Sequence, residues 1–251
     1  MARAVATEAG ELLCALRVEL VGEDPATLRA QGDRRSHELI VGRLESLRPA
    51  DCILSEEAAD DSDRLHRSRV WIVDPLDGTR EYAEPDRSDW AVHVALWEDG
   101  VLVAGAVALP GIGSTLSTAA PPSLPQPPDR TLRMVVSRSR PPEAVQEVVR
   151  VLGMELLPMG SAGAKAMAVV RGEADAYVHA GGQYEWDSAA PVAVAAAVGL
   201  HTSRIDGSPL RYNRPDPLLP DLVICRPELA DRILTTIAGT GMTSRAATQP
   251  L

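Results

Sequence analysis

The sequence predicts an α/β protein, in which helices cover the faces of β-sheets. Three observations favour this fold class. Apolar residues recur at helical spacing near the N-terminus, and β-rich runs separated by turn residues follow. Strand-like and helix-like runs then alternate towards the C-terminus. Both kinds of element therefore occur in each half of the chain.

The run 121–128 divides the chain, because it holds five prolines in eight residues. Proline continues neither a helix nor a sheet, so this Pro-rich connection is expected to be a linker or a surface loop. We expect an N-terminal α+β half at 1–120, with an antiparallel-rich sheet, and a C-terminal α/β half at 129–251. A chain of 251 residues suits one large domain or two small ones.

In the first half, two helices precede the strands. Apolar residues at helical spacing predict a helix at 3–21, and the pattern after Gly32 and Asp33 predicts another at about 36–47. Strands are expected at 52–54, 70–73, 91–97, 101–109 and within 111–118. The residues 98–100 (EDG) are typical of a tight hairpin turn.

In the second half, strands and helices alternate. Strands are expected at 131–137, 155–157, 174–179 and 222–225. Helices are expected at 142–152, 162–171, 188–199 and 227–238. The residues 206–208 (DGS) predict a turn.

The bulk properties exclude several classes of protein. A net charge of −10 without an arginine-rich arm argues against nucleic acid as the main partner. No apolar run approaches the roughly 20 residues of a membrane span, and no signal-peptide pattern opens the chain. The three cysteines are widely spaced, which argues against a disulfide framework. We expect a cytoplasmic protein that binds neither nucleic acid nor membrane.

The most informative stretch is 74–79 (DPLDGT), directly after the apolar run 70–73. It places two carboxylates three residues apart on a turn that leaves a buried strand. Carboxylate oxygens suit Mg²⁺, and N–H groups at such a turn suit a phosphate. Glu56 and Asp187 also lie at the ends of predicted elements. Gathering acids is unfavourable unless cations neutralise them, so these residues suggest metal-assisted phosphate hydrolysis.

Three motifs carry a resemblance to a known family: EE at 56–57, DPLDGT at 74–79 and WDSAA at 186–190. In order and spacing they resemble those of the inositol monophosphatase superfamily, which are Mg²⁺-dependent, lithium-sensitive phosphomonoesterases. The resemblance covers nearly the whole chain and implies a layered αβαβα sandwich with the active site between the two halves. It is strongest to the bacterial CysQ-type branch, which removes the 3′-phosphate of 3′-phosphoadenosine 5′-phosphate.

The resemblance implies a set of metal ligands. Glu56, Asp74 and the backbone carbonyl of Leu76 would hold one Mg²⁺, and Asp74, Asp77 and Asp187 would hold a second. Leu76 is thus expected to serve as a backbone ligand and not as a packing residue. Lithium would inhibit by taking the place of a metal ion.

The resemblance also implies catalytic roles. Thr79 would orient the attacking water together with Glu56, and Asp77 would act at the leaving oxygen through the second ion. Asp33 would help a third, loosely held metal or its water. Because such residues also cap helices, an N-cap role stays open for Asp33, Thr79 and Asp187.

A further group of residues is expected to bind the substrate. It comprises Gly78, Thr79, Ser137, Arg138, Arg140, Ser161, Lys165 and Asp187. Lys165 is the only lysine among the 25 basic residues, which suggests a tight pocket that needs a compact charge. Ser137, Arg138 and Arg140 would hold a second phosphate. No acid lies between His179 and Gln183, where inositol-directed members carry a glutamate, so a phosphonucleotide is favoured.

Several alternatives stay open. The same metal site would serve inositol-1-phosphate or fructose-1,6-bisphosphate, and 3′-phosphoadenosine 5′-phosphosulfate is a further candidate substrate. A phosphonucleotide-binding sensor without turnover is a non-enzyme alternative. A phosphoaspartate mechanism is disfavoured, because Pro75 stands where its nucleophile would be. No histidine is assigned a role, and a homodimer is suggested only by the family.

Overall fold

The computed structural model describes residues 1–124, 126–127, 129–138 and 143–241. Arg140, one of the proposed substrate residues, lies outside the described residues.

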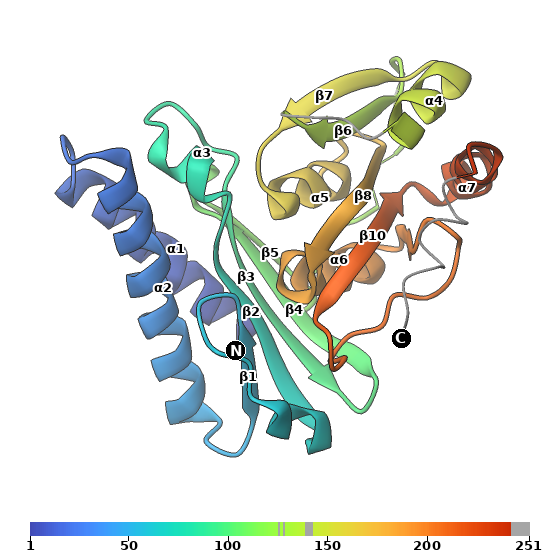
Figure 1. Ribbon diagram of the computed structural model, residues 1–251. Helices are drawn as coiled ribbons and strands as arrows, with labels where there is room; N and C mark the ends of the chain where they lie inside the picture. The colour runs from blue at the N-terminus through green and yellow to red at the C-terminus, as the bar shows by residue number, and fades with distance from the viewer. Residues whose placement is uncertain (125, 128, 139–142, 242–251) are drawn as a thin grey trace.

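Two long helices and a five-stranded sheet form the first part of the chain (Figure 1). The helices are α1 (Ala2–Glu19) and α2 (Pro25–Leu47). The strands are β1 (Cys52–Ser55), β2 (Arg69–Asp77), β3 (Ala91–Glu98), β4 (Val101–Leu109) and β5 (Ser114–Ser117), side by side in this order. β1 and β2 are parallel and the later neighbours antiparallel. Three short helices connect these elements: η1 (Ser62–His66), α3 (Thr79–Ala83) and η2 (Pro110–Ile112).

The second part of the chain builds another five-stranded sheet, in the order β7-β6-β8-β10-β9. Its strands are β6 (Arg133–Ser137), β7 (Glu155–Met159), β8 (Ala176–Tyr184), β9 (His201–Ser203) and β10 (Leu218–Cys225). The helices are α4 (Glu143–Leu152), α5 (Ala162–Val170), α6 (Glu185–Val198) and α7 (Ala230–Gly239), the last preceded by η3 (Pro227–Leu229). β6 is parallel to β7 and β8, and β10 is antiparallel to β8 and β9.

The elements stack in five layers. α1 and α2 cover the outer face of the first sheet, α5 and α6 lie between the sheets, and α4 and α7 cover the second sheet (Figure 1). One core joins the two sheets through the middle layer. Val107 of β4, Ala190 of α6 and Ile224 of β10 are all fully buried in it. The predicted αβαβα sandwich is confirmed. The division of the chain at 121–128 stays a prediction, and this core takes side chains from both sides of it.

Helix α2 begins at Pro25 and not near residue 36. Asp24 caps it, because its carboxylate accepts the N–H groups of Ala26 (2.9 Å) and Thr27 (3.1 Å). Asp33 therefore lies inside the helix, and the N-cap role considered for it is wrong. Gly32 also lies inside this helix, where a Cβ would come within 2.7 Å of the Tyr82 ring and 2.9 Å of Cδ2 of Leu76.

Two further helix starts differ from the expectation. α6 begins at Glu185 and not at residue 188, because Asp187 accepts the N–H of Tyr184 (2.6 Å) from within the first turn. Asp187 is therefore not the N-cap. α3 has Gly78 as its N-cap, at a φ of 85°, and Thr79 is its first helical residue. The N-cap role considered for Thr79 is therefore wrong by one residue, and β9 was not predicted from the sequence.

Candidate active site

Both aspartates of the 74–79 stretch are buried and lie at the C-terminal end of β2. Asp74 and Asp77 are 1% and 7% exposed, and the ladder to β3 is interrupted between them. Oδ1 of Asp74 accepts the Leu76 N–H at 3.0 Å, and Ser36 of α2 donates to the Pro75 carbonyl at 2.7 Å. These bonds fix the turn that aims the two carboxylates.

Leu76 has two structural roles. Its side chain is 2% exposed and packs in the core beneath α1 and α2, so the expectation that it is not a packing residue is wrong. Its carbonyl accepts a hydrogen bond from Oγ1 of Thr79 at 3.2 Å. Because the hydroxyl proton is used in this bond, the Thr79 oxygen can still accept a hydrogen bond from another group.

Glu56 and Asp187 approach these aspartates from other elements. Glu56 follows β1, next to β2, and its carboxylate contacts Asp74. Partial loss of water and the charge of Asp187 raise the pKa of Glu56 to about 7. Burial and the charge of Asp77 raise the pKa of Asp187 to about 6. The four carboxylates predicted as metal ligands therefore meet in one place.

His93 also belongs to this site, although the sequence analysis assigned it no role. It lies opposite Asp74 on β3, and its Nδ1 is 3.0 Å from the Trp186 carbonyl. A carbonyl only accepts, so Nδ1 carries a proton. Nε2 lies 3.2 Å from Oδ2 of Asp77. Burial opposes a charge on His93, but the contact with Asp77 outweighs it and raises the pKa. We interpret His93 as a buried cation that orients Asp77, not as a metal ligand.

Asp77 also holds the start of α5. Its Oδ1 accepts the N–H of Ala162 at 3.1 Å, and its Oδ2 accepts that of Gly163 at 2.6 Å. A Cβ at Gly163 would lie 2.1 Å from Nε2 of His93, so glycine permits this approach. The hydroxyl oxygen of Ser161, proposed for substrate, caps α5 by accepting a backbone N–H at 2.8 Å.

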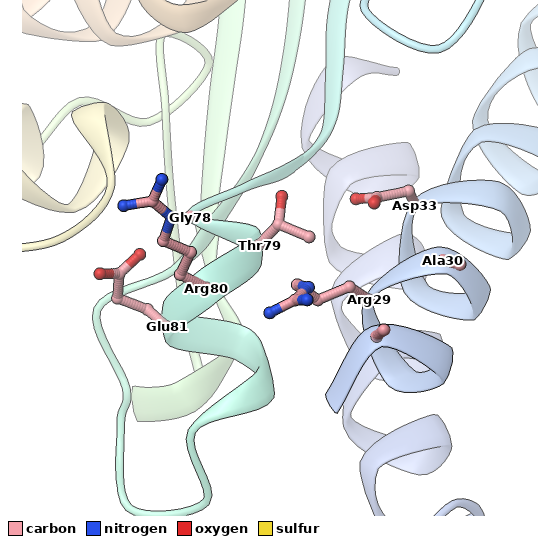
Figure 2. A pocket seen from close by; sticks show the side chains of 8 residues that line it. Arg29, Ala30, Asp33, Gly78, Thr79, Arg80 and Glu81 are labelled. Atoms are coloured by element: carbon pink, nitrogen blue, oxygen red, sulfur yellow. The ribbon is translucent and has the colours of Figure 1, made fainter. Parts of the chain in front are cut away.

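A cavity of about 700 Å³ lies between α2 and α3, beside the turn that follows Asp77 (Figure 2). Its walls come from Ala26, Arg29, Ala30, Asp33, Gly78, Thr79, Arg80 and Glu81. Asp33 points across it towards Thr79. Burial and the charge of Glu57 raise the pKa of Asp33 to about 7. Asp33 is thus brought to the site from the interior of a helix.

Lys165 is placed beneath the site, with 5% of its surface exposed. Its ammonium group donates to the Gly160 carbonyl and lies 5.4 Å from the centre of the Tyr177 ring. Burial lowers its pKa, although the charge of Asp77 acts in the opposite direction. Lys165 is therefore closely enclosed, and its contact with substrate stays a prediction.

Arg138 lies at a smaller cavity of about 280 Å³. Arg80, Glu81, Ser137 and Gly160 complete its lining. Arg138 forms ion pairs with Glu81 and, at 3.0 Å, with Glu84. A phosphate bound here would share the guanidinium group with two carboxylates.

The donor set fits a hard divalent cation. Oδ2 of Asp74 is buried and has no hydrogen-bond partner among the described residues. Such an atom is unfavourable unless a cation meets it. Burial and the charge of Glu56 raise the pKa of Asp74 well above its usual range. Oxygen atoms of Glu56, Asp74, Asp77, Asp187 and the Leu76 carbonyl are the donors that would hold Mg²⁺.

These shifts predict that the metal-free protein loses stability as the pH rises. Because Glu56 and Asp33 have pKa values raised to about 7, the folded state holds protons that the unfolded chain releases near pH 4. This stabilisation is complete below about pH 4 and is lost as the pH rises through 7. Each proton contributes at most about 1.4 kcal/mol per pH unit, roughly 3–6 °C in Tm, and Glu56 contributes less because solvent screens it.

Thermal melts in EDTA between pH 5 and 8 would measure this effect. Mg²⁺ should restore the Tm at pH 8, and Glu56→Gln should flatten the decline. A Tm in EDTA that rises across this pH range would contradict the proximity of the carboxylates.

Comparison with known proteins agrees with this geometry. The model of the inositol monophosphatase family matches residues 1–241. The chain is 50% identical to the 3′-phosphoadenosine 5′-phosphate phosphatase of Mycobacterium tuberculosis, over 92% of this chain and 90% of that protein. Its identity to the Mycobacterium leprae protein of the same name is 48%, with 94% and 92% covered.

Among solved structures, CysQ from Bacteroides thetaiotaomicron, a bacterial member of the inositol monophosphatase family, has a TM-score of 0.76 and 26% identity. The match covers 90% of this chain and 95% of that chain. Among the described residues, every helix is too short or too polar to cross a lipid bilayer. The chain belongs to the inositol monophosphatase family.

Proposed function

We propose that this chain is a Mg²⁺-dependent phosphomonoesterase that removes the 3′-phosphate of 3′-phosphoadenosine 5′-phosphate and releases AMP and phosphate. The meeting of Glu56, Asp74, Asp77 and Asp187 in one place, with Asp74 and Asp77 buried, is the observation that carries this proposal. The substrate comes from the relatives at 48–50% identity that are named for this reaction.

The residues around the carboxylates have distinct tasks in this reaction. Bound Mg²⁺ would neutralise the cluster, polarise the phosphoryl group and acidify water. The Thr79 oxygen accepts a hydrogen bond from the attacking water, because its own proton is donated to Leu76. Asp33 lies across the cavity from Thr79, and burial and the charge of Glu57 raise its pKa to about 7, which suits a carboxylate that takes a proton from this water. Glu56 would serve as a ligand of the metal ion. The N–H groups of Gly78 and Thr79 are the proposed donors to the phosphoryl oxygens.

The decisive experiment measures phosphate release from three substrates side by side, with Mg²⁺ and with EDTA. We expect Mg²⁺-dependent release, fastest from 3′-phosphoadenosine 5′-phosphate. Faster turnover of inositol-1-phosphate or fructose-1,6-bisphosphate would overturn the substrate assignment. Tight binding of the phosphonucleotide without phosphate release would instead support a sensor. Inhibition by millimolar Li⁺ remains a prediction for the same assay.

The second phosphate of the substrate is proposed to lie at Ser137 and Arg138, in the smaller cavity. Arg138→Gln should therefore raise the KM for 3′-phosphoadenosine 5′-phosphate about tenfold, the typical loss of one charge-assisted hydrogen bond. The KM for 3′-AMP, which lacks the 5′-phosphate, should stay unchanged. Steady-state kinetics on both substrates would test this.

Arg133→Gln is a matched control, because Arg133 lies on β6, the strand that leads to Arg138, and forms an exposed ion pair with Glu155 of β7. An equal rise in KM for both substrates would remove Arg138 from the second-phosphate site. A selective effect of Arg29→Gln, and not of Arg138→Gln, would place that phosphate in the cavity of Figure 2, because Arg29 lines this cavity and not the smaller one.

A further inference from the structure

Arg64 is a buried arginine that lies, along the sequence, between two of the proposed metal ligands. It lies in η1, after Glu56 and before Asp74, and is 1% exposed. Its Nε and Nη2 donate to the Asp60 carboxylate at 2.6 and 2.7 Å. Its Nη1 donates to Oδ1 of Asn213 at 2.7 Å, and Nη2 also donates to the next carbonyl at 2.8 Å. Arg64 thus joins the segment between the two ligands to the loop before β10.

Glu185 holds the same loop from the other side. It is also 1% exposed, and its carboxylate accepts the N–H of Asn213 at 2.6 Å and the following N–H at 2.9 Å. Oγ of Ser188 lies 3.2 Å from the Tyr212 hydroxyl. Glu185 and Ser188 flank Asp187 in the first turn of α6. The loop therefore contacts α6 on both sides of a proposed metal ligand.

The first turn of α6 needs such support, because it carries a charge into a cluster of like charges. The carboxylates of Asp187, Glu56, Asp74 and Asp77 repel one another when no cation neutralises them. This repulsion acts to separate α6 from the end of β2. The contacts of Arg64 oppose it, since they join the segment before β2 to the loop that holds α6.

We propose that Arg64, Asn213 and Glu185 form a brace that positions Asp187 against Glu56 and Asp74 and so sets the affinity of the site for divalent cations. They are positioning residues, because they act through Asp187. The proposal rests on the metal site of the proposed function and is independent of which phosphate ester is the substrate.

The test is a Mn²⁺ titration of the metal-free protein, followed by electron paramagnetic resonance without substrate. Asn213→Gly removes the side-chain bonds to Arg64 but keeps the N–H that Glu185 accepts, and glycine tolerates the φ of 58° at this position. We expect the Kd for Mn²⁺ to rise at least tenfold in Asn213→Gly and in Arg64→Met. The Mg²⁺ concentration for half-maximal hydrolysis should rise in proportion, while the substrate KM at saturating Mg²⁺ stays within twofold.

Arg130→Met is the matched control. Arg130 also binds a buried carboxylate, Asp175 at 2.8 Å, and backbone carbonyls at 172 and 173, but within the second sheet and its loops. It should lower the Tm and leave the Mn²⁺ affinity unchanged. Unchanged Mn²⁺ affinity in Asn213→Gly would overturn the proposed brace. Because this variant leaves Arg64 in place, it tests the proposal even if Arg64→Met does not fold. Failure to hydrolyse the phosphonucleotide would defeat the proposed function alone, because the titration contains no substrate.

Discussion

Asp74→Asn should lower kcat by three decades or more and at the same time raise the stability of the metal-free protein. The proposed site uses Asp74 for both metal ions, so its loss removes at least about 4 kcal/mol of transition-state stabilisation. The stability gain has a different origin. Oδ2 of Asp74 is buried, has no hydrogen-bond partner among the described residues and faces other carboxylates.

The asparagine keeps the oxygen that accepts the Leu76 N–H and replaces the unpaired oxygen by a donor. The neutral amide also removes the repulsion between the carboxylates of Asp74 and Glu56. Removing an unsatisfied buried group is worth roughly 1–3 kcal/mol, about 2–10 °C in Tm for a chain of this size.

Thermal melts of wild type and variant, in EDTA and separately in Mg²⁺, would measure the change in metal-free Tm and the stabilisation by the metal ion. Mg²⁺ should stabilise the wild type and have little effect on Asp74→Asn. A variant with a lower metal-free Tm, or with a tenth of the wild-type turnover, would contradict this account.

The sequence predicted the parts of the site that lie close together along the chain. A buried strand that ends in a turn with metal-binding acids was predicted from the apolar run 70–73 and the acids of 74–79. Strand β2 has this form. The five layers came from the resemblance to a family, because periodicity alone does not say which helix covers which sheet. Glu56 and Asp187 were singled out as acids at the ends of predicted elements, and the family motifs assigned them to the same metal site.

The sequence could not show contacts that depend on register or on distant loops. His93 reaches Asp77 only because β3 pairs with β2 in a particular register. The bond between Arg64 and Asn213 joins residues 149 positions apart. The start of α2 was missed for another reason: Gly32 resembles a helix-start signal, but packing against Leu76 is what requires a glycine there.

Asp77→Asn should lose as much activity as Asp74→Asn but should destabilise the fold. The loss of a proposed ligand again lowers kcat by about three decades. The two oxygens of Asp77 accept the N–H groups of Ala162 and Gly163, and an asparagine has only one acceptor for these two donors. His93 also loses its counter-charge. One buried N–H left without an acceptor costs roughly 1–3 kcal/mol, about 2–10 °C in Tm.

Asp89→Asn separates the structural effect from the catalytic one. Oδ2 of Asp89 accepts the Gly160 N–H at 2.6 Å, so it holds the same loop from outside the carboxylate cluster. This control should lower the Tm and keep kcat within tenfold of the wild type. We therefore expect both Asp74→Asn and Asp77→Asn to be inactive. The metal-free Tm should rise in the first variant and fall in the second. Changes of the same sign would show that Asp74 and Asp77 do not differ in the way their hydrogen bonds indicate.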